Sequence, residues 1–236
     1  MSLIGIIGAM QIEIEGLLAD MQDVDVTTAA GLSFHQGKLA DKDVVVACCG
    51  IGKVNAAMCA QAMVDRFPLL CLINLGVAGA ISNELNIKDV VISKHLVQHD
   101  FDITSAGHEP GFVPNLGIEI PADQNLAKAA FAACQEVLAQ GNNKAHIAPI
   151  ATGDQFVAHK DIKRRVSDVF NAYCVEMEGA AIAQVCHHNG LPFVVIRAIS
   201  DKADGSAEMD FADFVAAAAD NSIKIVKRMV ISDDSI

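Results

Sequence analysis

The sequence predicts an α/β fold of three layers, in which helices cover both faces of a central mixed, mostly parallel sheet. Short, almost continuously apolar runs rich in β-branched residues, such as PFVVIRAIS at 192–200, alternate with longer segments of helical periodicity. Strands that are apolar on both faces are typical of sheets buried between helices. Their alternation with helices is typical of connections between parallel strands.

In the first half of the chain, strand and helix patterns follow one another closely. A hairpin turns near residues 40–42, and its second strand ends at Cys49. The helix expected before Pro68 stops there, because the residue before a proline disfavours helical backbone. The expected elements are a strand at 3–8, a helix at 10–21, the hairpin at 33–49, a helix at 54–67 and strands at 69–76 and 89–93.

In the second half, glycines mark two helix ends. Gly141 and Gly190 each follow a segment of helical periodicity, and glycine is the preferred residue just past a helix C-terminus. The expected elements are a helix at 123–141, a strand at 145–152, a helix near 159–169, a strand at 172–177, a helix at 177–190, a strand at 192–200 and a closing helix at 210–230.

Composition limits the classes of function. The 236 residues contain no linker-like or repetitive stretch, which favours a single domain over 1–236. A net charge of -12 with scattered lysines and arginines argues against a nucleic-acid partner. The opening segment lacks a basic signal-peptide region, and the longest apolar run, at 69–81, is too short to span a bilayer. We therefore expect a cytoplasmic protein with no membrane association.

The cysteines and histidines do not suggest a metal. The seven cysteines are odd in number, lie mostly in apolar segments and form no C-x-x-C pair, so we expect reduced core thiols. His95 and His99 have a spacing that suits a metal on a helix, but they follow a strand-like run. No spacing in the sequence suggests a metal or an organic cofactor.

Polar residues interrupt the apolar pattern where predicted strands end, which is where ligands collect in α/β sheets. Glu13 opens the first helix, and Arg197 lies within an apolar strand that ends in Ser200 and Asp201. Two simpler interpretations stay open at this point. Glu13 could serve only to complement the helix dipole. Arg197, which is costly to bury alone, could form a scaffold ion pair with Glu176 or Glu178.

Two glycine-rich segments add to this pattern. NLGVAGA at 74–80 has glycines that would let backbone amides approach a ligand. GIGKVN at 50–55 is not a nucleotide-binding phosphate loop, because Ala47 replaces its first glycine and Val54 its Ser or Thr.

The fragments GIIGAM, CGIGKVNAA, NLGVAGA, TGDQF, VEMEGAAIAQVC and RAISD, in this order, closely resemble the bacterial 5'-methylthioadenosine/S-adenosylhomocysteine nucleosidases of the purine nucleoside phosphorylase superfamily. The resemblance runs from residue 3 to about residue 230. It implies hydrolysis of the N-glycosidic bond of these nucleosides, and of 5'-deoxyadenosine, with release of adenine. It also implies a homodimer, in which we expect the Gly/Pro-rich segment 103–115 to complete the neighbour's site.

The resemblance implies roles for the catalytic residues. Asp201 matches the general acid that protonates N7 of adenine, and Ser200 matches the residue that holds it. Since an acid must be protonated when it acts, we expect the folded site to raise the pKa of Asp201 above about 3.9. Glu13 matches the base that activates water on the opposite face of the sugar.

Further matches concern substrate binding. Glu178 matches the residue that binds the ribose hydroxyls, and Arg197 matches a substrate-binding residue that stays near the ribose and this glutamate, whereas we expect Glu176 to be structural. Phe156 matches the aromatic that stacks on the purine, although a plain core phenylalanine is the alternative. The other matched positions are Met177 under the sugar, the Val157 backbone at the purine edge, and Met10, Ile51 and Phe211 around the base and the 5'-thio group.

Two departures leave the substrate preference open. Val77 stands where many members have serine, and the segment 107–115 lacks a common tyrosine. Aminodeoxyfutalosine stays an alternative substrate. A phosphorylase is disfavoured because no arginine lies in the segments GIIGAMQIE and NLGVAGA, which would hold phosphate. A non-catalytic nucleoside-binding or storage protein is disfavoured because the carboxylates of Glu13, Glu178 and Asp201 are all present.

Overall fold

The computed structural model describes residues 2–203 and 207–232, apart from the side chains of residues 208, 210 and 232. The elements along the chain are β1 (Leu3–Gly8), α1 (Gln11–Asp20), β2 (Met21–Ala29), β3 (Leu32–Leu39), β4 (Lys42–Cys48), α2 (Lys53–Arg66), β5 (Leu69–Ala80), β6 (Val90–Gln98), the 3-10 helix η1 (Thr104–Ala106), β7 (Ile120–Pro121), α3 (Gln124–Val137), β8 (Ala145–Thr152), α4 (Lys160–Phe170), β9 (Cys174–Glu176), α5 (Gly179–Asn189), β10 (Phe193–Asp201) and α6 (Ala207–Ser232).

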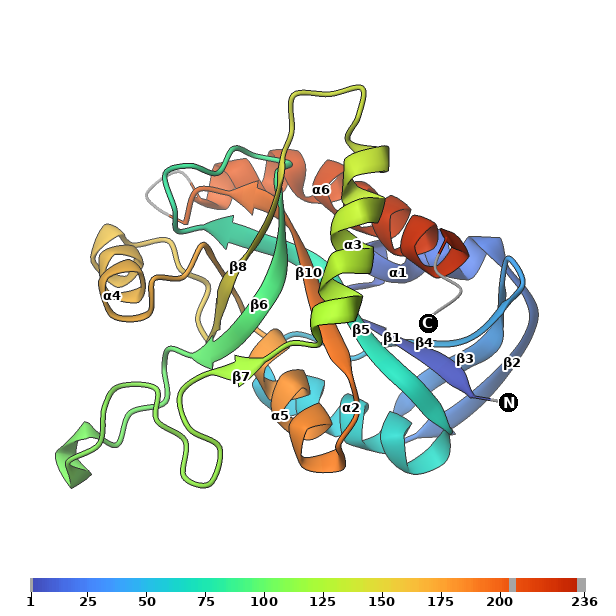
Figure 1. Cartoon of the computed structure of the whole chain (residues 1–236), viewed down its shortest axis with the longest axis horizontal. Helices are drawn as coiled ribbons and strands as arrows, with labels where there is room; N and C mark the ends of the chain where they lie inside the picture. The colour runs from blue at the N-terminus through green and yellow to red at the C-terminus, as the bar shows by residue number, and fades with distance from the viewer. Residues whose placement is uncertain (1, 204–206, 233–236) are drawn as a thin grey trace.

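The described strands form one mixed sheet (Figure 1). β1 pairs in parallel with β4 and β5, and β5 pairs in parallel with β10. β6, β8 and β9 also run parallel and end in register at Gln98, Thr152 and Glu176. Antiparallel pairings of β10 with β6 and of β5 with β9 connect these two groups. Strands β5, β10, β6, β8 and β9 therefore close into a ring, from which β1, β4, β3 and β2 extend as an open sheet.

Helices cover both sides of this sheet, as the alternating apolar side chains of the strands require (Figure 1). Leu3 and Ile7 of β1 face α2 and α5, whereas Ile4 and Ile6 face α1, α3 and α6. The helices contribute small residues at these contacts, for example Ala180 to Ala183 of α5. The predicted α/β fold with helices on both sides of a mixed sheet is confirmed.

The structure corrects several details of the predicted elements. β2 and β7 were missed: β2 is an edge strand whose sequence, MQDVDVTTA, is exposed along most of its length and lacks an apolar face. β5 continues to Ala80 and β6 to Gln98, past the apolar runs that predicted them. α3 stops at Val137, before the glycine at 141. His95 lies in β6 and His99 just after it, so the strand interpretation of this pair is confirmed.

None of the helices in residues 2–203 and 207–232 has the length and hydropathy that a membrane span requires. The same part of the chain contains no group of three or more His, Cys, Asp or Glu side chains that could hold a metal ion. All seven cysteines are free thiols, and all but Cys48 are buried.

Candidate active site

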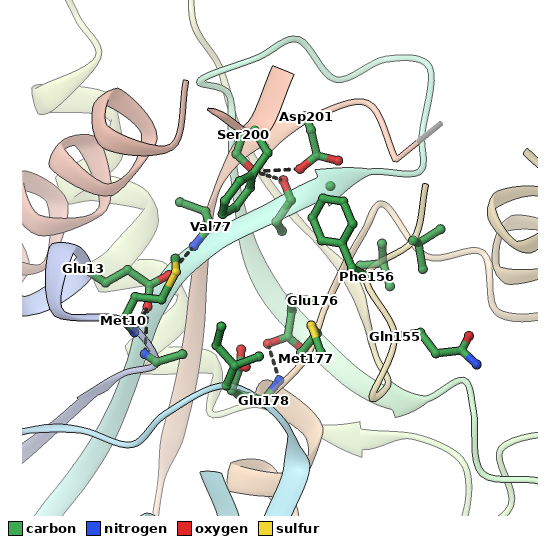
Figure 2. A pocket seen from close by; sticks show the side chains of 17 residues that line it. Met10, Glu13, Val77, Gln155, Phe156, Glu176, Met177, Glu178, Ser200 and Asp201 are labelled. Atoms are coloured by element: carbon green, nitrogen blue, oxygen red, sulfur yellow. Dashed lines mark hydrogen bonds between the residues drawn. The ribbon is translucent and has the colours of Figure 1, made fainter. Parts of the chain in front are cut away.

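A pocket opens where β1, β9 and β10 end beside β5 and where the loops after β4 and β8 meet (Figure 2). All the residues that the sequence analysis assigned to a site line this pocket, except Arg197. The remaining lining residues are neighbours of predicted ones along the chain. The lining residues are Ala9, Met10, Glu13, Ile51, Val77, Ala78, Gly79, Gln155, Phe156, Val157, Val175, Glu176, Met177, Glu178, Ser200, Asp201 and Phe211.

Glu13 is held at one side of the pocket by backbone amides. The N–H groups of Ala9 and Met10 donate to Glu13 Oε2 at 2.7 and 2.9 Å, and the N–H of Val77 donates to Oε1 at 3.1 Å. Burial raises the pKa of Glu13 above its ordinary value, although Arg197 and these three amides act in the opposite direction. The carboxylate does cap the start of α1, and it also faces the pocket, so it is more than a helix-dipole partner (Figure 2).

Asp201 lies at the end of β10 and is 2% exposed. The Ser200 hydroxyl donates to Asp201 Oδ1 at 2.7 Å, and the N–H of Ala203 donates to Oδ2 at 2.9 Å. A β-bulge in the pairing of β10 with β5 occurs at this point and places the two consecutive residues side by side. The Ser200 hydroxyl thus restrains the orientation of the Asp201 carboxyl group.

Two glycines of β5 make room for these groups. A Cβ atom on Gly79 would lie 2.7 Å from Asp201 Oδ2. A Cβ atom on Gly76 would lie 2.3 Å from Arg197 Nη1 and 2.7 Å from Glu13 Oε1. Gly79 lines the pocket, so the expected approach of a ligand to the backbone of NLGVAGA stays a prediction. Gly76 and Gly79 also leave space for charged side chains of the site.

Arg197 and Glu176 form a buried ion pair beneath the pocket. Glu176 accepts hydrogen bonds from Arg197 Nε at 3.1 Å and from Arg197 Nη2. The same carboxylate accepts from the N–H groups of Glu178 and Gly179 at 3.1 and 2.7 Å and from the Thr152 hydroxyl. Glu176 therefore orders the turn from β9 into α5.

Arg197 lies behind the pocket wall rather than on it. Its side chain is 1% exposed, and Nη2 also donates to Asn74 Oδ1 at 2.7 Å. Burial alone would favour a neutral group, but Glu176 and Glu178 raise the pKa of Arg197, so the guanidinium stays charged. The predicted position of Arg197 beside the glutamates is correct. Its influence on a ligand would act through Glu176 and Glu178.

Glu178 faces the pocket and has fewer partners than Glu176 (Figure 2). The N–H of Gly52 donates to Glu178 Oε1 at 2.9 Å, and Oε2 lies 3.6 Å from Arg197 Nη2. Burial and the charge of Glu176 raise the pKa of Glu178 to about 7, against the influence of Arg197 and the Gly52 amide. Because Glu178 accepts fewer hydrogen bonds within the protein than Glu176 does, its carboxylate can accept further ones from a ligand.

Apolar side chains form the opposite part of the pocket. The rings of Phe156 and Phe211 meet edge to face, with centroids 5.7 Å apart. Phe156 is 46% exposed, so it is a pocket residue and not a plain core phenylalanine. Val157 is buried behind it, and Ile51 is 53% exposed at the rim. Such a surface suits a flat aromatic ring and an apolar substituent.

Comparison with known protein families identifies the superfamily of this chain. Residues 3–231 match the family described as the Phosphorylase superfamily. A 5'-methylthioadenosine/S-adenosylhomocysteine nucleosidase of Marinomonas sp. (strain MWYL1) is 41% identical over 231 residues, which are 98% of this chain and 99% of the relative. The chain therefore belongs to the 5'-methylthioadenosine/S-adenosylhomocysteine nucleosidase family within that superfamily.

Solved structures agree with this assignment. The nucleosidase of Neisseria meningitidis in complex with methylthio-immucillin-A has a TM-score of 0.93 and 38% identity, covering 99% of this chain and 100% of that one. The futalosine hydrolase of Helicobacter pylori has a TM-score of 0.91 and 36% identity, covering 98% of each chain.

Proposed function

We propose that the protein hydrolyses the N-glycosidic bond of 5'-methylthioadenosine and S-adenosylhomocysteine, and of 5'-deoxyadenosine, releasing adenine and the 5-substituted ribose. The observation that supports this most directly is the meeting of Glu13, Glu178 and Asp201 in one pocket with a mostly apolar lining. Cleavage of this bond needs an acid for the base, a base for water and negative charge near the sugar. The three carboxylates can supply these functions.

Asp201 acts as the general acid. Adenine is a poor leaving group as an anion, so a proton must reach N7 as the bond from C1' to N9 breaks. The hydrogen bonds from Ser200 and the Ala203 amide fix the carboxyl group for this transfer. We expect Asp201→Asn to abolish adenine release and to leave nucleoside binding largely intact. Near-normal turnover would remove Asp201 from this role.

Glu13 acts as the general base. It takes a proton from the water that attacks C1', so the hydroxide adds to the sugar as adenine departs with the proton from Asp201. The raised pKa of Glu13 brings its basicity closer to that needed near neutral pH. Glu13→Gln should stop turnover in the same way, whereas a wild-type rate would leave Glu13 with a capping role only.

Glu178 binds the ribose hydroxyls, and Met177 forms the wall under the sugar. A carboxylate there accepts two hydrogen bonds, and its charge favours a sugar that becomes cationic in the transition state. Arg197 supports this role from behind through its contacts with Glu176 and Glu178.

The apolar side of the pocket receives the base and the 5' group. Phe156 stacks on the purine, and the backbone of Val157 bonds its edge. Met10, Ile51 and Phe211 surround the base and the thioether, and Val77 lies where the water or the ribose is held. A free 5'-hydroxyl would lose its hydrogen bonds in the apolar 5' pocket. These are the other described residues that we assign to substrate contact.

Two related activities make useful alternatives. The futalosine hydrolase of H. pylori resembles this chain nearly as closely as the nucleosidases do, which supports aminodeoxyfutalosine as a second candidate substrate. A phosphorylase would need a cationic side chain for phosphate. No lysine or arginine lines the pocket in the part of the chain that the structure describes, which favours water as the acceptor.

The decisive experiment follows adenine release from 5'-methylthioadenosine with and without phosphate and identifies the sugar product. Phosphate-independent release of free 5-methylthioribose supports the proposal. Release that requires phosphate and yields the 1-phosphate would make the protein a phosphorylase. Release from aminodeoxyfutalosine alone would assign that substrate, and binding without any release would indicate a nucleoside-binding protein.

We also propose that the protein works as a homodimer. Ile51, Val54 and Met58 expose apolar surface beside the pocket, with 77% of Val54 accessible. The segment 101–119 extends away from the rest of the molecule (Figure 1). We expect its residues 103–115 to complete the 5' end of the neighbour's site. A fully active monomer at assay concentration, identified by sedimentation, would refute this arrangement.

The cysteines bear on location. All seven are free, and burial raises the pKa of Cys59 and Cys71 to about 12, which makes these thiols unreactive. Free thiols throughout are typical of a reducing compartment. We propose that the protein acts in the cytoplasm, and fractionation of its source cells would test this.

A further inference from the structure

The loop that carries Phe156 and Val157 has no regular secondary structure of its own. It leaves β8 at Thr152 and enters α4 at Lys160. Phe156 is almost half exposed, so packing alone does not fix its position. Val157 anchors the loop after Phe156, because it is buried in a cluster with Val166 and Phe170. Contacts made earlier in the loop then set where the aromatic ring lies from the other side.

Three residues from three separate segments form a closed cycle of hydrogen bonds at the start of this loop. The N–H of Lys53 donates to Asp154 Oδ1 at 2.8 Å. The N–H of Asp154 donates to Asp100 Oδ2 at 2.8 Å. Lys53 Nζ donates to Asp100 Oδ1 at 2.7 Å, which closes the cycle. We call Lys53, Asp100 and Asp154 the clasp.

The clasp connects the two sides of the pocket. The N–H of Gly52 donates to Glu178 Oε1, on the side of the pocket that we assign to the sugar. The next N–H, that of Lys53, donates to Asp154 in the loop that we assign to the base. Gly52 has φ 98°, which favours glycine, and a Cβ atom there would lie 3.0 Å from Asp154 Oδ1. A shift of Asp154 would therefore change the distance between the base-binding and sugar-binding groups.

Within the clasp, Lys53 and Asp100 are partly shielded from water, whereas Asp154 is exposed. The side chains of Lys53 and Asp100 are 18% and 17% exposed. Lys53 Nζ also donates to Gln98 Oε1 at 3.2 Å, and Gln98 donates to Gln184 of α5 at 2.8 Å. Burial by itself would raise the pKa of Asp100, but the bonds from Lys53 and the Asp154 amide hold it below its ordinary value. Both oxygens of Asp100 thus accept from the clasp as a carboxylate.

A histidine supports the loop from the other side. A Cβ atom on Gly153 would lie 2.3 Å from His99 Nε2, so the backbone of the loop rests directly on the imidazole ring. The N–H of Gly153 donates to the carbonyl oxygen of Glu176 at 3.1 Å. The loop is therefore fixed at Gly153 and Asp154, immediately before the residues that line the pocket.

We infer that Lys53, Asp100 and Asp154 are positioning residues for nucleobase recognition, which set the loop carrying Phe156 and Val157 at the correct distance from Glu178. This inference rests on the proposed function only in taking the base to bind against Phe156. The clasp residues make no part of the pocket lining. They act through the loop, and their loss weakens the binding of a purine without removing any group that touches it.

The test measures adenine affinity by calorimetry in Asp100→Asn and Lys53→Met. Asparagine has one acceptor oxygen and therefore cannot serve both Lys53 and the Asp154 amide. Methionine removes the Nζ contact and keeps the backbone N–H of residue 53. Loss of one charge-assisted hydrogen bond from the clasp should raise the Kd for adenine about 10-fold in each variant. The double variant should bind adenine no worse than the weaker single variant, because the cycle acts as a unit.

Two controls separate positioning from general destabilisation. Asp43→Asn breaks the surface pair of Lys38 and Asp43, 3.1 Å apart, and should leave the Kd unchanged. Leu126→Ala removes a buried side chain from α3, away from the clasp, and should lower the Tm without a change in adenine affinity. Sedimentation of each variant verifies an unchanged oligomeric state, since Lys53 lies beside the exposed surface at Val54.

Hydrogen exchange provides a readout that needs no ligand. The amide of Asp154 should exchange faster in Asp100→Asn than in the wild-type protein, while amides of α3 should not. Adenine Kd values within twofold of wild type in both clasp variants, or unchanged exchange at residue 154, would overturn the inference.

The inference and the proposed function fail in different ways. A wild-type protein that binds adenine but cleaves no nucleoside would refute the hydrolase. It would leave the clasp supported if the clasp variants bind adenine more weakly than the wild-type protein. Normal turnover with wild-type adenine affinity in the variants would refute the clasp alone. A wild-type protein with no affinity for adenine would overturn the inference, whereas the hydrolase would still be decided by adenine release.

Discussion

Replacing Glu176 with glutamine tests the division of labour between the two neighbouring glutamates. Five donors converge on the Glu176 carboxylate, and it is 5% exposed. Glutamine keeps one acceptor oxygen and turns an N–H₂ group toward donors. It also leaves the Arg197 guanidinium, 1% exposed, without its main counter-ion.

The expected loss of stability follows from that geometry. Removing one partner of a buried ion pair costs about 3–5 kcal/mol. Glu178 Oε2 lies 3.6 Å from Arg197 and can partly replace the lost charge, so we expect a loss of about 3 kcal/mol, at the lower end of that range. For a chain of this size, that corresponds to a decrease in Tm of roughly 6–12 °C.

Urea unfolding at fixed protein concentration, followed by circular dichroism, measures the free energy of unfolding of Glu176→Gln. The protein concentration is fixed because association shifts apparent stability. Adenine release by the folded fraction should fall much less than in Glu178→Gln. A stability loss under about 1 kcal/mol, the value of an exposed pair, together with lost turnover, would refute the structural role of Glu176.

Glu178→Gln is the matched control, and its effect on stability depends on pH. The pKa of Glu178 in the folded protein, about 7, exceeds its ordinary value of 4.5. The folded state therefore binds this proton more tightly, and its contribution to stability is lost as pH rises from 4.5 to about 7. Glutamine removes that loss, so Glu178→Gln should be more stable than wild type at pH 8 and similar near pH 4.5. A stability difference that does not change with pH would contradict this.

Three further predictions concern activity. The kcat/KM of the wild-type protein should fall below about pH 7, because Glu178 accepts ribose hydrogen bonds at both oxygens and carries a negative charge only when ionised. A profile that stays flat from pH 5 to 8 would contradict this. Gly76→Ala should reduce kcat by about 100-fold, because the added Cβ would displace Arg197 and Glu13 and a small misplacement of catalytic groups costs about that factor in rate. Wild-type kinetics would show that both side chains can move without loss of activity. Phe156→Ala should raise KM about 10-fold through lost stacking, and an unchanged KM would place the purine elsewhere.

Sequence patterns located the site because its residues stand at the ends of apolar strands. Glu13, Ser200 and Asp201 are polar exceptions in otherwise apolar segments, and their positions follow from the ends of β1 and β10. The same argument anticipated contact between Arg197 and the glutamates. These features depend on local sequence and on the general rule that ligands bind at the carboxyl ends of strands in α/β sheets, so the sequence alone can predict them.

Other features depend on how distant segments meet. The sequence did not show that five strands close into a ring, because that requires the antiparallel pairing of β5 with β9. It gave no sign that Gly76 serves Arg197, since the two are adjacent only through the register of β5 and β10. The clasp was missed for the same reason. Lys53 and Asp100 are ordinary charged residues in sequence, and only the fold brings them to Asp154.

The balance of buried charge connects the stability of this protein with its chemistry. Among the described residues of the site, Arg197 bonds directly to Glu176, whereas Glu178 lies 3.6 Å from Arg197 and Glu13 accepts its hydrogen bonds from backbone amides. Two such carboxylates are unfavourable in the free protein, as the raised pKa of each indicates. Burial is the main cause of both shifts. A sugar that gains positive charge as adenine departs offsets the cost of these buried negative charges, so the interaction is stronger in the transition state than with the neutral nucleoside. Glu178→Gln, which should stabilise the protein at pH 8, should therefore also strongly reduce its rate.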